Sequence, residues 1–192
     1  MTCADLVIPK GTEVWRIYYR GGPHPMAWNE FRSAGLPSGR FDHRGPTTPT
    51  PGRKILHAAR DLHTPFAECF QRTRVIDRTL DDPWLVCFAL VRDVTLLDLT
   101  GPWPTRAGAS LALSTGPHSR ARGWSRRIYE DYPRIEGLHY PSSMHGARYA
   151  TMAFYERAED SLPALPVSHR ALSDPALDGV VATAMALFRY GA

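Results

Sequence analysis

The chain is 192 residues long, with 43% hydrophobic and 22% charged residues and a formal net charge of +4. These values predict one domain over residues 1–192 with a sizeable core, and they exclude a disordered chain. No apolar run reaches the roughly 18 residues of a membrane span and no signal-peptide pattern opens the chain, so we expect a cytoplasmic protein without membrane contact.

The cysteines and arginines indicate which cellular compartment and which kinds of binding partner to expect. Cys3, Cys69 and Cys87 are an odd number without Cys-x-x-Cys spacing, which favours buried thiols in a reducing compartment over disulfides or zinc. Only Lys10 and Lys54 among the 23 basic residues are lysines. Arginine forks suit phosphate binding, although high-GC coding bias explains the same excess. No DNA- or RNA-recognition motif is present, so we expect no nucleic-acid partner.

Alternating apolar residues predict the first strand at 13–20. Trp15 marks one face of this strand, and Arg16 lies on the other. Residues 21–53 are rich in Gly, Pro, Ser and Arg without any periodicity, and they carry Arg40. A loop of this length is usually functional or disordered.

A short buried strand is predicted at 54–59, followed by a helix over 65–74. Thr64 suits the N-cap of this helix, and Pro65 suits its first position. Glu68 then lies one turn inside the helix among apolar neighbours, where the helix N-terminus favours its ionised form and desolvation opposes it.

The second half of the chain continues with strands and two helices, and its apolar run at 84–91 is typical of a central strand. Because strands and helices do not alternate regularly, we expect an α+β fold, a curved mixed or antiparallel sheet flanked by helices. The other predicted elements are strands at 94–99, 137–143 and 149–156, a helix at 118–132, and an amphipathic helix at 173–190 capped by Ser173 or Asp174.

Common catalytic motifs are missing from the sequence. There is no Gly-x-Gly-x-x-Gly after a strand, no P-loop, no Gly-x-Ser-x-Gly and no His-Glu-x-x-His. His57 and His63, and likewise His139 and His145, are six residues apart, which is not a metal-binding spacing, so we expect no metal. A Ser142–His–Asp triad stays open, because nothing singles out its acid.

Four polar residues at the edges of apolar elements are candidates for a site: Arg16, Arg40, Glu68 and Ser142. Each also has a structural explanation. Arg16 can pack its stem along the strand, Arg40 can be a solvated loop charge, and Ser142 can be turn chemistry after proline. Glu68 precedes Arg72 by four residues, the favourable order for a surface ion pair.

The order of several motifs resembles the RES-domain family, which is named after Arg, Glu and Ser. After an arginine on an early strand come "GRF", "ILHAARDLHTPFAECF", "GLHYPSSMHG" and "ATMAFYERA", and the similarity covers about residues 15–157. The resemblance matches Arg16 and Arg40 to the family's arginines, Glu68 to its glutamate and Ser142 to its serine.

The resemblance implies a fold similar to ADP-ribosyltransferase and diphtheria-toxin-like domains. It implies an enzyme that degrades NAD⁺ by hydrolysis or phosphorolysis, with phosphate as co-substrate in the second case and no other cofactor. Many members look like bacterial toxins neutralised by an Xre-like antitoxin, so a homo-oligomer or a hetero-oligomer with an antitoxin is implied as well.

The same resemblance suggests roles for the candidates. Glu68 would stabilise the ribosyl cation, and Arg16 and Arg40 would bind the diphosphate. Ser142 would hydrogen-bond either the nicotinamide ribose or the carboxylate and so fix its orientation. Tyr18, Phe41 and His57 can stack on a ring of the substrate or pack in the core. The chain departs from the family pattern in three places: His57 replaces a tyrosine, Phe41 replaces a tryptophan, and Ser143 next to Ser142 leaves the serine ambiguous.

Two rival functions stay open. The first is transfer of ADP-ribose to a protein or nucleic acid, which uses the same site with another acceptor. The second is a non-catalytic module that binds a nucleotide or a partner protein, which the departures at His57 and Phe41 favour slightly.

Overall fold

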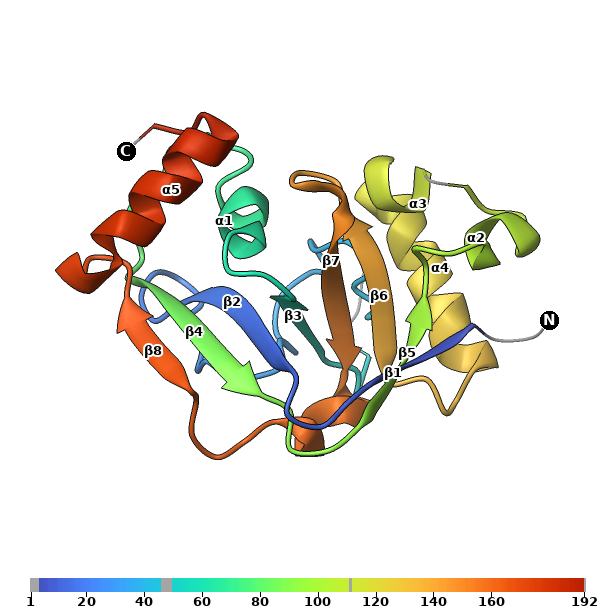
Figure 1. The fold of residues 1–192 in the computed structure, drawn as a ribbon. Helices are drawn as coiled ribbons and strands as arrows, with labels where there is room; N and C mark the ends of the chain where they lie inside the picture. The colour runs from blue at the N-terminus through green and yellow to red at the C-terminus, as the bar shows by residue number, and fades with distance from the viewer. Residues whose placement is uncertain (1–3, 46–49, 111, 192) are drawn as a thin grey trace.

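A computed structural model describes residues 4–45, 50–110 and 112–191. Within these ranges eight strands form one open sheet in the order β1-β5-β6-β7-β3-β2-β4-β8 (Figure 1). Neighbouring strands are antiparallel except for β5 and β6, which are parallel. The predicted mixed sheet flanked by helices is therefore confirmed.

The described chain contains the following elements. The strands are β1 (Asp5–Ile8), β2 (Glu13–Tyr19), β3 (Ile55–Ala59), β4 (Pro83–Ala89), β5 (Val94–Asp98), β6 (Gly137–Ser142), β7 (Gly146–Tyr155) and β8 (Ser168–Ala171). The helices are α1 (Thr64–Cys69), α2 (Trp103–Arg106), α3 (Ala112–Thr115), α4 (His118–Asp131) and α5 (Asp178–Phe188), with 3-10 turns η1 (Glu156–Ser161) and η2 (Pro175–Leu177).

The sequence missed the short elements at the periphery. β1 and β8 are four-residue edge strands, and α2 and α3 are single turns, so none is long enough to show a period. The 84–91 segment is apolar throughout, but β4 is the second strand from one edge rather than a central strand. The C-terminal helix starts at Asp178, because Asp174 caps η2 instead by accepting a hydrogen bond from the Ala176 amide.

Helix α1 is shorter than predicted and is capped differently. It ends at Cys69, and its N-cap position is His63 rather than Thr64. The carboxylate of Asp61 accepts hydrogen bonds from the backbone amides of His63 and Thr64, each at 3.0 Å. Asp61 therefore satisfies the first free amides of the helix, which Thr64 was expected to do.

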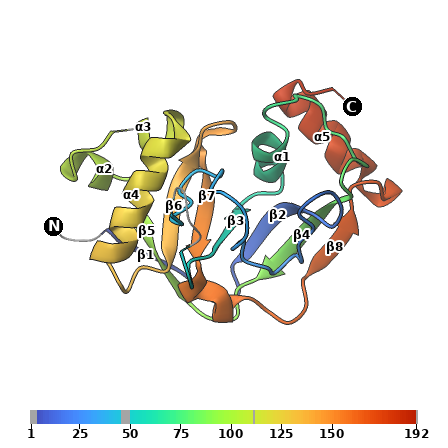
Figure 2. The same cartoon turned by 180° about the vertical axis from the view of Figure 1, so that it is seen from behind.

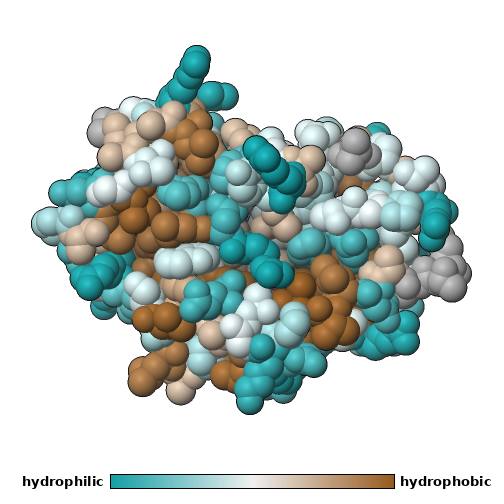
Figure 3. Space-filling model, viewed as in Figure 1, coloured by the Kyte–Doolittle hydropathy of each residue, from teal (hydrophilic) through white to brown (hydrophobic). Residues whose placement is uncertain are grey.

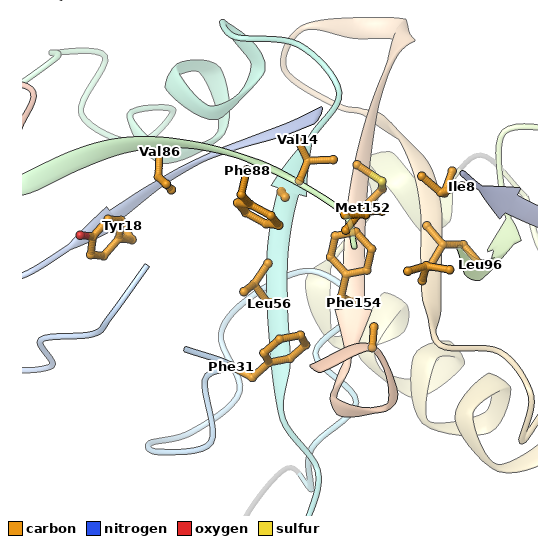
Figure 4. Close-up of a cluster of buried hydrophobic side chains, with 14 residues drawn as sticks. Ile8, Val14, Tyr18, Phe31, Leu56, Val86, Phe88, Leu96, Met152 and Phe154 are labelled. Atoms are coloured by element: carbon orange, nitrogen blue, oxygen red, sulfur yellow. The ribbon is translucent and has the colours of Figure 1, made fainter. Parts of the chain in front are cut away.

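The buried side chains pack on both faces of the sheet. One cluster covers the face away from the helices and includes Leu56 from β3, Phe88 from β4 and Phe154 from β7 (Figure 4). On the other face, a second cluster lies between α4 and the β5–β7 strands, and a third lies beneath α1 and α5. Alternation along β7 places Phe154 on one face and Tyr155 on the other.

The sheet is weakly joined between β2 and β3. These two strands share one register pair, Trp15 with Ala59, while β2 pairs with β4 along its whole length. Farther along β3, Ile55 pairs instead with Arg32 from the long loop. Seen from behind, that loop runs across the sheet beside β2 and β3 (Figure 2). The strands therefore diverge beneath α1.

The surface carries apolar residues among polar ones. Leu165 and Val167, in the segment leading to β8, and Leu187 on α5 are exposed. Figure 3 shows apolar atoms on that side of the molecule, interspersed with polar groups. Scattered exposure of this kind is usual. None of the described helices is long and apolar enough to cross a membrane.

Candidate functional site

A hydrogen bond joins Glu68 on α1 to Ser142 at the end of β6. The Ser142 hydroxyl donates to Glu68 Oε1 at 2.6 Å, and it accepts from the amides of Met144 at 3.2 Å and His145 at 3.0 Å. An irregularity between Pro141 and Ser142 turns the strand at this point. The buried Ser142 thus has its hydroxyl oriented by the backbone, and none of the histidine side chains in the described ranges hydrogen-bonds to it.

The environment of Glu68 raises its pKa. Burial is the main cause, and the Ser142 hydrogen bond and the charges of Arg40 and His118 oppose it only in part. The predicted help from the helix N-terminus is wrong, because α1 has six residues and Glu68 is the fifth of them. Among the described residues no ion pair joins Glu68 to Arg72, since the helix ends before Arg72.

A small cavity of about 70 Å³ lies where β2 and β3 diverge under α1. Glu68 lines this cavity together with Arg16 and His57 from the two strands. Its other lining residues are Trp15, Ile17, Ala58, Ala59, Thr64, Pro65, Cys69 and Thr151. The cavity therefore has mostly apolar walls, with a carboxylate and an arginine at its border.

Arg16 is a buried cation without an ion-pair partner in the described chain. Its side chain is on the same face of β2 as Val14 and Tyr18, opposite Trp15, as the alternation predicted. Its Nη1 donates to the carbonyls of Trp28 at 2.9 Å and Glu30 at 3.3 Å, and its buried Nε has no partner. Desolvation lowers the pKa of Arg16 to about 10, so the side chain stays charged at neutral pH.

Arg40 and His57 hold the long loop against the site. Arg40 Nη1 donates to the carbonyls of Leu113 at 3.0 Å and Gly116 at 2.9 Å, and the Arg40 charge lowers the pKa of Glu68. His57 Nε2 lies 2.8 Å from the Arg40 carbonyl, which can only accept, so His57 donates there. His57 thus both lines the cavity and fixes the segment that presents Arg40.

Comparison with protein families identifies the family of this chain. A model described as the RES domain matches residues 13–175, most of the chain. The chain belongs to the RES-domain family. Its fold is similar to that of a chain in the crystal structure of the M. tuberculosis MbcT–MbcA toxin–antitoxin complex, with a TM-score of 0.55 and 14% sequence identity over 84% of this chain and 87% of that one. No curated protein matches the sequence.

Two of the predicted substrate-binding residues of this RES domain lie in the core. Phe41 is fully buried and packs on Tyr140, with ring centroids 4.6 Å apart. Tyr18 is on the face of β2 opposite Ile17, and its hydroxyl lies 2.6 Å from His169 Nε2. The burial of both rings favours the alternative that they pack in the core over the alternative that they stack on the substrate.

Other residues near Glu68 were not expected from the sequence of this RES domain. His118 starts α4, and its charge acts on Glu68. Tyr140 on β6 is buried, and burial together with the Glu68 charge raises its pKa. Thr151 lines the cavity, and its buried hydroxyl has no hydrogen-bond partner among the residues that the structure describes. No local pattern could reveal these residues, since each comes from a different element.

The cysteine predictions for this RES domain had mixed outcomes. Cys87 is buried as expected, but Cys69 is exposed at the border of the cavity, and Cys3 lies outside the described residues. In the part of the chain that the structure describes, no three His, Cys, Asp or Glu residues form a group suited to a metal ion.

Proposed function

We propose that this RES domain degrades NAD⁺ by cleaving the bond between nicotinamide and ribose. The observation that carries the proposal is the half-buried Glu68 carboxylate, oriented by Ser142 at the edge of a mostly apolar cavity. Family membership supports the same conclusion.

The chemistry needs an anion more than an acid. When the C1′–N bond breaks, its electron pair goes to the nicotinamide nitrogen, which becomes neutral without receiving a proton. The ribose is left as an oxocarbenium-like cation. Glu68 stabilises that cation, and a water or phosphate oxygen then forms the new bond to C1′ and, in the case of water, loses a proton. Preorganised charges of this kind contribute typically ~10²–10³ in rate.

The arginines supply the charge that a diphosphate requires. The Nη2 and Nε atoms of Arg40 have no partner within the described ranges, so one edge of its guanidinium is available for phosphate oxygens. Arg16 adds positive charge beneath the cavity. Pockets that hold whole ligands usually measure roughly 300–1,000 Å³. We therefore infer that only one ring of the dinucleotide enters the cavity.

We further propose that the protein is the toxin of a bacterial toxin–antitoxin pair and acts in the cytoplasm. The support is the fold shared with a chain of a toxin–antitoxin complex. The partner would be an Xre-like antitoxin, either alone or in a larger hetero-oligomer.

The deciding experiment is to incubate purified protein with NAD⁺, with and without inorganic phosphate. We expect release of free nicotinamide, together with ADP-ribose if water attacks or a phosphorylated ADP-ribose if phosphate does. Radiolabel retained on a macromolecule would replace this proposal by ADP-ribosyl transfer. If micromolar protein consumes no NAD⁺ over hours, the proposal is wrong, and the remaining alternative is a non-catalytic binding module.

Replacing Arg40 with alanine should raise the KM for NAD⁺, because the lost guanidinium no longer contacts a phosphate. Charge-assisted hydrogen bonds contribute ~1.5–3 kcal/mol each, so we expect an increase of about tenfold or more. Exposed Arg72 is the matched control, and Arg72→Ala should leave KM unchanged. Equal KM values in the two variants would leave Arg40 with only the structural role of its bonds to the Leu113 and Gly116 carbonyls.

A further inference from the structure

The turn between β6 and β7 is tied to the start of α1 by a chain of three polar side chains. The Thr64 hydroxyl donates to the Asp61 carboxylate in a short hydrogen bond. His145 Nδ1 lies 2.8 Å from Thr64 Oγ1 and 3.5 Å from Asp61 Oδ1. Because Thr64 has one proton and gives it to Asp61, His145 Nδ1–H is the donor of the second bond.

The ring of His145 is held firmly in this position. It stacks on Tyr149 with ring centroids 3.5 Å apart and planes 2° apart, and its edge meets Phe188 of α5 at 4.9 Å. Only 6% of its side chain is exposed. The residue therefore has one orientation, which aims Nδ1 at Thr64.

The same residue also contacts the site through its backbone. The His145 amide donates to the Ser142 hydroxyl, which in turn donates to Glu68. Thr64 and Glu68 lie on the same short helix. The His145 side chain therefore bonds to α1, the helix that carries Glu68, and the His145 main chain bonds to Ser142.

We propose that His145 is a positioning residue, whose hydrogen bond to Thr64 keeps the Ser142 hydroxyl on Glu68. This inference rests on the proposed function for its effect on turnover, but not for its effect on the turn. Loss of the bond lets the turn drift from α1, and misplacement by about 1 Å can cost ~10²-fold in rate.

Two substitutions separate the hydrogen bond from the ring. His145→Phe keeps the stacking and loses the donor, whereas His145→Asn loses the ring and keeps a donor near the Nδ1 position. We expect kcat for NAD⁺ to fall about ten- to a hundredfold in His145→Phe with little change in KM, and His145→Asn to recover most of it. Thr64→Val should match His145→Phe, and the double variant should lose no more than either.

A second background tests whether His145 acts through Ser142. In a Ser142→Ala protein, adding His145→Phe should cause no further loss. His139→Phe is the control, because His139 on β6 likewise has an aspartate partner, Asp98, at 3.2 Å, but it is outside the site. Additive losses, or an equal loss in His145→Phe and His145→Asn, would overturn the proposal.

Amide hydrogen exchange provides a readout that needs no activity. The Met144 and His145 amides donate to Ser142, so in His145→Phe and Thr64→Val we expect exchange over 142–146 to speed up by about five- to tenfold, as for one lost hydrogen bond. Faster exchange in a protein that consumes no NAD⁺ would support the positioning role while the proposed function fails. Unchanged exchange together with unchanged kcat would overturn the positioning role of His145 and leave the proposed function standing.

Discussion

Replacing Glu68 with glutamine is expected to reduce NAD⁺ turnover by ~10²–10³-fold, because the neutral amide cannot stabilise the ribosyl cation. The amide keeps the size of the side chain and can still accept from Ser142, so KM should change little. The measurement is kcat from nicotinamide release. Exposed Glu13 provides the control, and Glu13→Gln should keep full activity.

The pH dependence should change in the same variant. Since burial raises the pKa of Glu68 above its ordinary value of 4.5, kcat of the native enzyme should fall as the pH is lowered through that raised pKa, where the carboxylate becomes protonated. The residual activity of Glu68→Gln should lack this limb. The variant should also melt at the same or a higher temperature, because a charge that is costly to bury has been removed. Activity within tenfold of the native enzyme would show that Glu68 is not the electrostatic partner.

Replacing Ser142 with alanine should have the second-largest effect. It removes the hydroxyl that orients Glu68 and leaves two backbone amides without their acceptor. A hydrogen bond to a charged group contributes ~1.5–3 kcal/mol, so kcat/KM should fall by roughly ten- to 150-fold. The acid limb should also move to higher pH, because the Ser142 bond is one of the influences that lower the pKa of Glu68.

The neighbouring serine is the matched control for this prediction. Ser143 is exposed, and the hydroxyl that donates to Glu68 is that of Ser142. Ser143→Ala should therefore retain native kcat/KM at every pH. A loss in Ser143→Ala with full activity in Ser142→Ala would move the serine role by one residue and contradict the geometry proposed here.

Local sequence patterns were enough for most of the regular elements. Alternation predicts β2, apolar runs predict β3 to β5, and amphipathic spacing predicts α4 and the last helix, because each pattern records which face of an element is buried. The order of short motifs also indicates the RES family without any tertiary information. Four-residue edge strands such as β1 and β8 carry too few residues to show a period.

The limits of α1 show where local patterns fail. The residues after Cys69 continue a plausible helical sequence, yet the helix ends there. That end changes the electrostatics of Glu68, since the carboxylate lies in the last turn instead of near a favourable N-terminus. Helix propensity is a weak preference that tertiary packing overrides.

The sequence by itself determined which residues are candidates for the chemistry, because residue type and motif order are local properties. Only the tertiary structure decided which of them meet. Strand pairing places β3 and β6 on either side of β7, and so brings Ser142 to Glu68 across 74 residues of chain. It also encloses Tyr18 and Phe41 in the core and joins His145 to Thr64. A periodic pattern shows that one face of an element is buried, but it does not show which other segment packs on that face. The contacts of Ser142, Tyr18, Phe41 and His145 all depend on which segment that is.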